Sequence, residues 1–399
     1  MNPLILYSII ILVGYLLGSI NPAYILGRIL KGIDIRSSGT KNAGTRNVKK
    51  VLGIGPAIVT GFFDFSKGLL SMFIAWKLGA PEIIIYGAGY AAVLGHIFPF
   101  YLGFRGGEGS ATGVAILLFL MIKAILNGWF SYEIFIPLAV LALSIQFITN
   151  FSEIVGTFTL PAFALLLLLK SPSNLTVLFI VVIIIQLFIV TLYNIKKLHL
   201  INWTDNKAKL LHWRTLARPL ALIIIIGGFY IEKNIILYVV GAVALVFIIL
   251  DLLRLLVKSL NLRLFQIPWL LKEKEKGQFS SMTFFLTAIF ILIMVFPQNI
   301  AAPAMIFIIF GDLFAKFFGL LYGKTPFLTK SLQGSIAYFA FSFFGGWIVG
   351  LYLPLPIWIL FLGALSASVT ESLTIFGIDD NFTVALISAS VMLALTLLT

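Results

Sequence analysis

The chain has 399 residues, of which 60% are hydrophobic and only 11% are charged, and it contains no cysteine. This composition excludes an ordinary soluble globular protein, a disulfide framework and a metal site built from thiolates. The formal net charge is +13, but the basic residues do not gather on one soluble face, so we expect no nucleic-acid partner.

Apolar runs long enough to cross a bilayer recur along the whole chain. We therefore predict an all-α, polytopic transmembrane protein with about seven spans in each of two modules. The predicted spans of the first module are near 4–26, 51–76, 83–101, 111–126, 132–148, 154–169 and 175–195. Those of the second module are near 216–231, 235–256, 281–296, 301–318, 335–351, 357–375 and 382–398. The first span has no basic residue before it, so we expect a permanent helix and not a cleaved signal peptide.

Lysine and arginine are distributed unevenly between the two sides of these spans. They follow the first, third, seventh, ninth and eleventh spans, whereas the opposite side receives only Lys77, Lys123, Lys170 and Lys233. The positive-inside rule then places the N-terminus outside and the basic loops in the cytoplasm. We expect a multi-pass protein of the cell inner (plasma) membrane, with active sites facing the cytoplasm and anionic membrane lipids as partners.

Two glycine-rich loops interrupt the first module. The first loop covers 34–50 and the second covers 95–112, and both combine glycines with lysine, arginine and small polar residues. Glycines let backbone N–H groups approach an anion, and nearby cations neutralise its charge. Because both loops follow odd-numbered spans, we expect them to meet on one side of the membrane around a phosphorylated substrate.

The first module resembles the bacterial acyl-phosphate:glycerol-3-phosphate acyltransferases of the PlsY type, over roughly residues 1–200. The resemblance rests on Gly18-Ser19-Ile20-Asn21-Pro22, on Asp64-x-x-Lys67-Gly68 and on the two loops, in family order and spacing. It implies transfer of an acyl group from acyl-phosphate to the sn-1 hydroxyl of glycerol-3-phosphate. The products are lysophosphatidate, for phospholipid biosynthesis, and phosphate, and no cofactor is implied because acyl-phosphate is already activated.

The resemblance also implies roles for individual residues of the two loops. His96 and Arg105 are the expected catalytic residues, with His96 as a general base near neutral pH. The phosphate of the acceptor is an equal candidate for that base. Asp64 and Lys67 lie three residues apart inside a span, where they either neutralise each other or support the site. The expected substrate-binding residues are Arg36, Thr40, Asn42, Gly44, Asn47, Lys50, Lys67, Gly106, Gly107, Gly109 and Thr112.

The first module departs from the family pattern at two places. Glu108 stands where the family usually has a lysine, which puts an anion beside the predicted phosphate site. Thr191 and Leu192 stand where the family has a His-Arg pair before the last basic loop. Lys49 or Lys41 is a candidate to compensate for Glu108, and the alternative is a lower substrate affinity. Full acyltransferase activity is therefore left open, whereas the predicted fold is unchanged.

The longest polar stretch after a complete set of spans is 196–218, and we place a domain boundary within it, around 204–207. The predicted domains are 1–204 and 205–399. Their polar loops share no motif, so a fusion of two different modules is favoured over a tandem repeat.

The second module carries acidic residues near span ends, with lysines and glycines between them. Such a set suits metal-bridged phosphoryl transfer, although acids that cap helix ends give the same pattern, and Asp379-Asp380-Asn381 alone is typical of a turn. No Walker A sequence occurs, which excludes a P-loop kinase.

Over roughly residues 210–399 the second module resembles the CTP-dependent dolichol, phytol and diacylglycerol kinases. The matching residues are Leu210-Leu211-His212, Arg254, Glu275, Gly311-Asp312, Gly319, Gly323-Lys324, Lys330-Ser331, Gly334, Glu371 and Asp379-Asp380-Asn381. The resemblance implies phosphorylation of a lipid alcohol with CTP and Mg²⁺. The expected metal ligands are Asp312, Asp379 and Asp380, the expected substrate-binding residues are Lys324, Lys330, Ser331 and Gly334, and Glu371 is a base or a metal partner. Gln333 departs from the family, which normally has a glutamate there.

The leading hypothesis is a bifunctional enzyme, with an acyltransferase first and a lipid-kinase-like domain second. One alternative is a transporter of a phosphorylated or anionic metabolite, although the spans show no inverted repeat and the charged motifs do not gather at the midplane. Another is a fusion with one inactive half, which the departures at Glu108, Thr191 and Gln333 allow.

Overall fold

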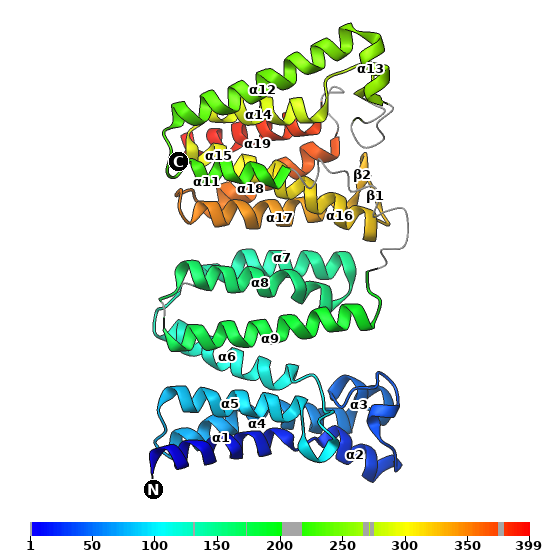
Figure 1. The fold of residues 1–399 in the computed structure, drawn as a ribbon, viewed down its shortest axis with the longest axis vertical. Helices are drawn as coiled ribbons and strands as arrows, with labels where there is room; N and C mark the ends of the chain where they lie inside the picture. The colour runs from blue at the N-terminus through cyan, green and yellow to red at the C-terminus, as the bar shows by residue number, and fades with distance from the viewer. Residues whose placement is uncertain are drawn as a thin grey trace. The chain divides into compact units, whose positions relative to one another are not determined.

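The computed structural model describes residues 2–130, 132–172, 174–201, 218–265, 271, 275–373 and 379–399. The predicted boundary at 204–207 and the Leu210-Leu211-His212 motif lie outside these residues. The chain divides into two compact units, and Figure 1 labels their helices. Unit 1 comprises Met1–Ile134 and Gly156–Leu198, and unit 2 comprises Phe135–Val155 and His199–Thr399. The helix after Ile134 therefore groups with unit 2, whereas the predicted domain 1–204 includes it. The division into domains 1–204 and 205–399 stays a prediction.

About 80% of the described residues are helical, and the chain forms an all-α polytopic membrane protein, which confirms the predicted fold class. Among the described residues, 9 helices are long and apolar enough to cross a membrane. Shorter apolar helices coincide with other predicted spans: Ser110–Leu126, Phe135–Thr149, Arg218–Gly227, Ser281–Val295 and Ile357–Leu373.

Unit 1 is a helical bundle with short polar elements at one end. Its elements are α1 (Pro3–Ser19), α2 (Pro22–Lys31), η1 (Ile35–Ser37), α3 (Thr45–Leu52), α4 (Ile54–Lys77), α5 (Glu82–Ile97), η2 (Phe100–Leu102), α6 (Ser110–Leu126), η3 (Tyr132–Ile134), most of α8 (Ser152–Lys170) and α9 (Leu175–Lys197). The predicted first span is two helices, because α1 ends at Ser19 with Ile20 as its C-cap, and α2 begins after an N-cap at Asn21. Its side chain accepts a hydrogen bond from the Tyr24 N–H at 2.9 Å, and Pro22 occupies the first helical position.

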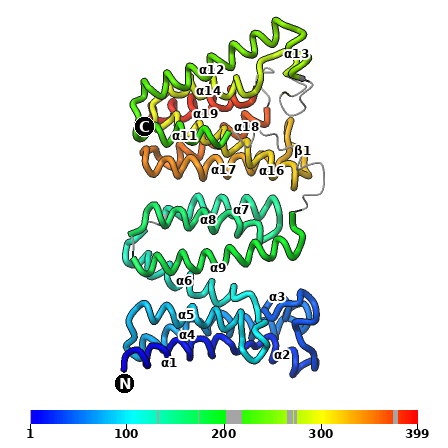
Figure 2. The backbone as a smooth tube through the Cα atoms, in the orientation of Figure 1, coloured from blue at the N-terminus to red at the C-terminus, as the bar shows by residue number. Residues whose placement is uncertain are grey.

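Small residues bring α1 and α5 into close contact, and the tube in Figure 2 shows them running along each other. A Cβ added at Gly18 would lie 2.1 Å from the carbonyl oxygen of Ala92, and one added at Gly95 would lie 2.1 Å from that of Tyr15. Such close backbone approach is how membrane helices pack without a hydrophobic driving force. It fixes the end of α5, where His96 lies.

Unit 2 contains α7 (Phe135–Thr149), η5 (Arg218–Ala221), α11 (Leu222–Gly227), α12 (Lys233–Leu256), α13 (Lys258–Phe265), α14 (Ser281–Val295), α15 (Gln298–Ile306), η7 (Phe307–Gly311), α16 (Asp312–Tyr322), β1 (Pro326–Phe327), β2 (Lys330–Ser331), α17 (Leu332–Gly350), α18 (Ile357–Leu373) and α19 (Asp380–Leu397). The two short strands pair antiparallel, with Pro326 opposite Ser331. α17 packs on α7, α16 and α18, and most of its residues are buried. It is the central helix of this unit.

Arg254, one of the residues that resemble the lipid kinases, is held by hydrogen bonds and an ion pair inside unit 2. Its buried guanidinium donates to the carbonyl oxygens of Glu275 at 2.7 Å and Gln278 at 2.8 Å, and it pairs with Asp251. The carboxylate of Asp251 also accepts from the Ser280 N–H at 2.7 Å. Arg254 thus ties the end of α12 to the segment that leads into α14.

Candidate functional site

The first glycine-rich loop is organised around the buried side chain of Asn47. The two N–H groups of its Nδ2 are shared among the carbonyl oxygens of Ile35, Ser38 and Asn42, at 2.8, 3.0 and 2.8 Å. Its Oδ1 accepts from the Thr40 N–H at 2.7 Å. Asn47 was predicted to bind substrate, and the structure places its amide inside the loop, where its hydrogen bonds hold the loop in shape.

Arg36 joins the first loop to the second. Its Nη1 donates to the carbonyl oxygens of Leu102 at 2.9 Å and Arg105 at 2.7 Å, and its Nη2 pairs with Asp34 at 2.8 Å. The hydrogen bond from Arg36 holds the pKa of the Asp34 carboxyl below its ordinary value, and Asp34 in turn raises the pKa of Arg36. The prediction that the two loops meet is confirmed by these contacts.

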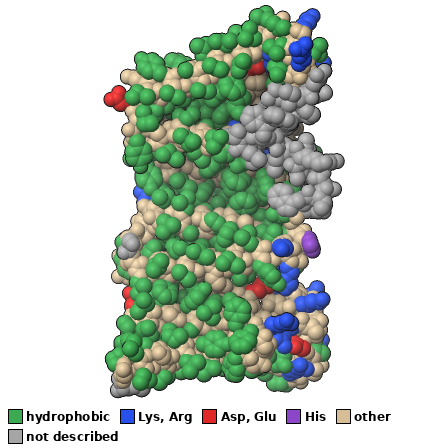
Figure 3. Space-filling view, in the orientation of Figure 1, with side chains coloured by type: hydrophobic (Ala, Val, Ile, Leu, Met, Phe, Trp, Pro, Cys, Tyr) green, Lys and Arg blue, Asp and Glu red, His purple; other side chains and the backbone are tan. Residues whose placement is uncertain are grey.

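A cleft of about 640 Å³ lies between the joined loops. It is lined by Asp34, Arg36, Ser37, Lys41, Leu102, Gly103, Arg105 and Gly106. Within the part of the chain that the structure describes, no hydrogen bond or ion pair involves the side chains of Lys41 and Arg105. In Figure 3 the Lys and Arg side chains of unit 1 gather at this end, whereas hydrophobic side chains cover its helices. The cleft therefore presents positive charge, on Lys41 and Arg105, that no group in the described part of the chain neutralises.

Behind the second loop, Asp64, Lys67 and His96 form a buried cluster with exposed fractions of only 1%, 1% and 4%. Lys67 Nζ lies 2.9 Å from Asp64 Oδ1, 2.6 Å from His96 Nδ1 and 3.2 Å from the carbonyl oxygen of Ile20. Thr112 donates its hydroxyl to the Asp64 carbonyl oxygen at 2.6 Å. The structure thus brings the predicted residues Lys67, His96 and Thr112 together at the junction of α4, α5 and α6.

Gly106 and Gly107 bring the second loop directly onto His96. The Gly107 N–H donates to the His96 carbonyl oxygen at 3.0 Å, and a Cβ at Gly107 would lie 2.1 Å from His96 Nε2. A Cβ at Gly106 would lie 2.0 Å from the same carbonyl oxygen. Gly109 has a left-handed φ of 72° and precedes the first turn of α6, a conformation that favours glycine.

Other predicted residues of the first loop lie beside the cleft or away from it. Gly44 precedes α3, Asn42 gives its carbonyl oxygen to Asn47, and Lys50 is exposed on α3 without lining the cleft. Lys41 lines the cleft but was not among the predicted substrate-binding residues. The sequence signal that could have indicated Lys41 as a binding residue is its position between Gly39 and Gly44.

Glu108 has a partner in unit 1. Its Oε2 accepts from Asn194 Nδ2 at 3.0 Å, so the carboxylate ties the second loop to α9. The family departure at this position therefore has a structural role in this chain. It does not line the cleft.

In unit 2, Asp312 begins α16 directly after the π-helical turn η7 and pairs with both Arg218 and Lys316. Arg218 is almost completely buried, and its Nε has no hydrogen-bond partner in the described part of the chain. Arg218 is not among the residues predicted for the site, although an arginine at the start of an apolar span is a signal of function.

Lys330 connects α18 and α19. Its Nζ lies 2.9 Å from Glu371 Oε1 and 3.0 Å from Asp380 Oδ2. Burial acts to lower the pKa of Lys330, but the two carboxylates outweigh it and the pKa is raised. Glu371 is buried, and its Oε2 makes no hydrogen bond to any residue that the structure describes.

The remaining predicted residues of unit 2 shape helix ends. Asp379 caps α19 by accepting from the Asn381 N–H, and Ser331 caps α17 by accepting from the Gly334 N–H at 3.2 Å. Gln333 Oε1 accepts from the backbone N–H groups of Lys324 at 3.0 Å and of Thr325. Gln333 therefore holds the turn after α16 through its amide oxygen.

The carboxylates predicted to hold Mg²⁺ do not form a metal centre among the described residues. No group of three His, Cys, Asp or Glu side chains there is placed to hold a metal ion. Asp312 and Asp380 face cations of the protein, and the Asp379 carboxylate accepts a hydrogen bond from the Asn381 N–H. This donor set does not fit a metal ion shared by the three.

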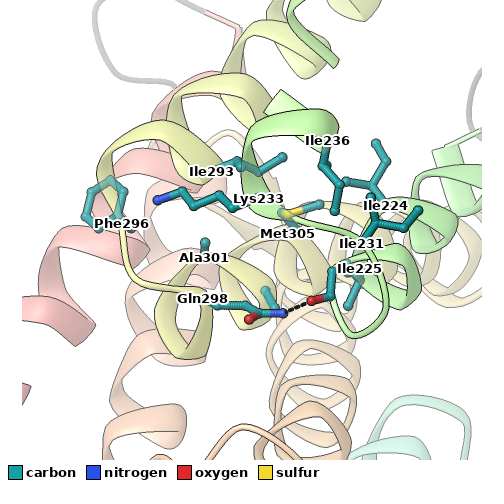
Figure 4. Close-up of a pocket in the computed structure, with 12 residues that line it drawn as sticks. Ile224, Ile225, Ile231, Lys233, Ile236, Ile293, Phe296, Gln298, Ala301 and Met305 are labelled. Atoms are coloured by element: carbon teal, nitrogen blue, oxygen red, sulfur yellow. Dashed lines mark hydrogen bonds between the residues drawn. The ribbon is translucent and has the colours of Figure 1, made fainter. Parts of the chain in front are cut away.

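A separate apolar pocket of about 130 Å³ lies in unit 2 between α11, α12, α14 and α15 (Figure 4). Isoleucines and Met305 line it, Lys233 lies beside it, and Gln298 Nε2 donates to the Gly228 carbonyl oxygen at 2.8 Å. No residue predicted for catalysis or binding lines this pocket.

Comparison with known proteins assigns the first part of the chain. A family described as glycerol-3-phosphate acyltransferase matches residues 8–200. A glycerol-3-phosphate acyltransferase of Shouchella clausii is 50% identical over 115 residues, which cover 28% of this chain and 56% of that relative. One of Synechococcus sp. (strain CC9902) is 36% identical over 163 residues, covering 41% of this chain and 78% of the relative. The chain spans little more than half the length of the first two relatives, 56% and 55%.

A solved structure is also similar to this chain. The crystal structure of PlsY, an integral membrane glycerol 3-phosphate acyltransferase, in its glycerol 3-phosphate form shares 27% sequence identity with a TM-score of 0.39. The match covers 48% of this chain and 91% of that chain. From the sequence matches, the chain belongs, through residues 8–200, to the glycerol-3-phosphate acyltransferase family.

Proposed function

We propose that unit 1 transfers an acyl group from acyl-phosphate to the sn-1 hydroxyl of glycerol-3-phosphate, for phospholipid biosynthesis. The observation that carries this proposal is the cleft between the two loops that Arg36 joins. Lys41 and Arg105 line this cleft, and their charges are unpaired among the described residues. Both proposed substrates carry phosphate groups, which such cations bind well. Membership of the acyltransferase family supports the same reaction.

The reaction needs two anions held side by side in one orientation. The hydroxyl oxygen of glycerol-3-phosphate attacks the acyl carbon, the bond from that carbon to the phosphate oxygen breaks, and phosphate leaves with the electron pair. The hydroxyl proton passes to a phosphate oxygen. Arg105 and Lys41 offset the charge of the anions, and the fixed loop geometry aligns hydroxyl and acyl carbon, which supplies much of the acceleration. We propose no cofactor for this step, because the acyl donor is already activated.

The test uses purified full-length protein with acyl-phosphate and glycerol-3-phosphate, and follows phosphate release and lysophosphatidate. Arg105→Ala should abolish both products. Lys77→Ala, at the far end of α4 and outside the cleft, is the matched control and should keep normal activity. Near-normal activity of Arg105→Ala would remove the second loop from the mechanism.

We also propose that the cleft faces the cytoplasm with the N-terminus outside, in the inner (plasma) membrane. The support is the clustering of basic residues beside the cleft and the positive-inside rule. Since the chain has no native cysteine, single cysteines at Ser37 and Phe104 should react with a membrane-impermeant reagent only from the cytoplasmic side. A cysteine at Lys77 should react only from outside.

For unit 2 we propose action on a lipid alcohol, with CTP-dependent phosphorylation as the candidate reaction. The observation that favours a polar substrate is the unpartnered buried oxygen of Glu371 beside Lys330, because ionisable groups inside a membrane bundle are functional candidates. Purified protein with CTP·Mg²⁺ and diacylglycerol or polyprenol tests the reaction. EDTA should stop this reaction by removing Mg²⁺ from the nucleotide substrate and should spare acyl transfer, whereas transport without either product would support the transporter alternative.

A further inference from the structure

We propose that Lys67 fixes the tautomer of His96, so that His96 carries its hydrogen on Nε2 and donates it to a phosphate oxygen of the substrates. Lys67 is then a positioning residue, and His96 is a hydrogen-bond donor and not a general base. This inference rests on the acyl transfer proposed for unit 1.

The three hydrogen bonds of Lys67 determine which nitrogen of His96 has the lone pair. An ammonium group has three N–H donors and no acceptor, and Lys67 Nζ has three acceptors within reach, Asp64 Oδ1, the Ile20 carbonyl oxygen and His96 Nδ1. The third bond requires a lone pair on Nδ1. A neutral imidazole with that lone pair has its hydrogen on Nε2.

The competing arrangement places the hydrogen on Nδ1. Asp64 Oδ1 lies 3.2 Å from His96 Nδ1, so His96 as an Nδ1–H donor to Asp64 requires Lys67 to be a neutral amine. An alkylamine is a far stronger base than an imidazole, and a buried carboxylate such as Asp64 needs a cation beside it. Both facts keep the proton on Lys67.

The other nitrogen of the ring faces the second loop. Nε2 has no hydrogen-bond partner among the described residues, where the ring contacts are made by Nδ1, and the His96 residue keeps a small exposed surface. Gly107 lies directly against it, and any side chain there would cover it. An N–H at this position suits an anionic oxygen. The proton of the attacking hydroxyl then goes to the phosphate of a substrate.

Nitrogen-15 spectra of the full-length protein in lipid nanodiscs test this tautomer directly. The chain has 3 histidines, and His96→Gln identifies the signals of His96. The expected result near neutral pH is a bare Nδ1 and a protonated Nε2. A hydrogen on Nδ1, or a doubly protonated ring, would overturn the proposal. Because the spectra need no turnover, they give this answer even if the chain transfers no acyl group.

Kinetics of variants separate positioning from simple loss of structure. Lys67→Met should let the ring carry its hydrogen on Nδ1 toward Asp64 and should raise KM for the phosphate substrates about tenfold or more. Lys67→Arg, which keeps a buried cation, should restore the Nε2 tautomer. Lys77→Met on the same helix should change neither the spectrum nor KM. An unchanged His96 spectrum in a folded Lys67→Met variant would contradict the proposed role of Lys67.

Discussion

The guanidinium of Arg36 donates a hydrogen bond to the backbone carbonyl oxygen of Arg105, 69 residues further along the chain, at 2.7 Å. The same nitrogen donates to the Leu102 carbonyl oxygen. The side chain of Arg36 therefore holds the two loops together through the backbone of the second loop. The placement of the second loop beside the first depends on this contact. The side chain of Arg105 is left available for a ligand.

We expect Arg36→Lys to lower kcat/KM for acyl transfer at least about tenfold although the charge is kept. A lysine cannot donate to two carbonyl oxygens and a carboxylate with a planar fork. Steady-state kinetics with both substrates varied will measure the effect. Arg28→Lys, at an exposed arginine that bonds Tyr24, is the control and should be neutral. Wild-type kinetics in Arg36→Lys would show that the contact between the loops is dispensable.

Gly107→Ala should destabilise unit 1 by about 1–3 kcal/mol and remove acyl transfer, because the new methyl group would overlap His96 Nε2 and the Ala43 carbonyl oxygen. Thermal unfolding in detergent and product formation are the measurements. Gly55→Ala is the matched control, since a Cβ there meets no atom within 4 Å. Equal losses in both variants would contradict the steric explanation.

The Asp34–Arg36 pair predicts an acid-sensitive first loop. The hydrogen bond from Arg36 lowers the pKa of Asp34 from 3.8, with burial opposing the shift. A carboxyl with a lowered folded pKa stabilises the loop at pH values above its unfolded pKa and loses this contribution as the pH falls through the folded value. Pepsin should therefore cut within residues 32–44 faster as the pH falls from about 5 to 2. In Asp34→Asn the loop should be cut readily throughout, with little change in that range.

In unit 2, Lys330→Met should lower the unfolding temperature, because it leaves the buried Glu371 carboxylate without its cation. We expect a cost of about 1–3 kcal/mol, and the added substitution Glu371→Gln should recover much of it. Lys324→Met is the control for stability, since only the backbone of Lys324 is hydrogen-bonded among the described residues. If the double variant is no more stable than Lys330→Met, the pair is not the source of the loss.

The fold class and the meeting of the two loops could be predicted, because they depend on local hydrophobicity and on the alternation of sides along the chain. The apolar runs predict helices, and successive basic loops predict a common side. The interior role of Asn47 could not be predicted. An asparagine in a glycine-rich loop is equally suited to bind a phosphate or backbone carbonyls, and only the folded loop determines which.

The partners of the carboxylates in unit 2 could not be predicted from the sequence either. Sequence order indicates acids near helix ends but does not show which cation each one meets. Asp312 meets Arg218, which lies 94 residues earlier in the chain, and Asp380 meets Lys330. The order of these acids along the sequence suits a Mg²⁺ site, but in the structure Asp312 and Asp380 form ion pairs with basic side chains. The helix cap formed by Asp379 was the alternative that its turn-like sequence allowed.

The grouping of α7 with α17 has a consequence for anyone who wishes to study the acyltransferase part alone. The polypeptide leaves unit 1 after Ile134, contributes one helix to unit 2 and returns at Gly156. A fragment ending near residue 200 would contain α7 without α17, and the face of α7 that packs on α17 would be exposed. The two units are interleaved along the chain, and a single cut does not separate them.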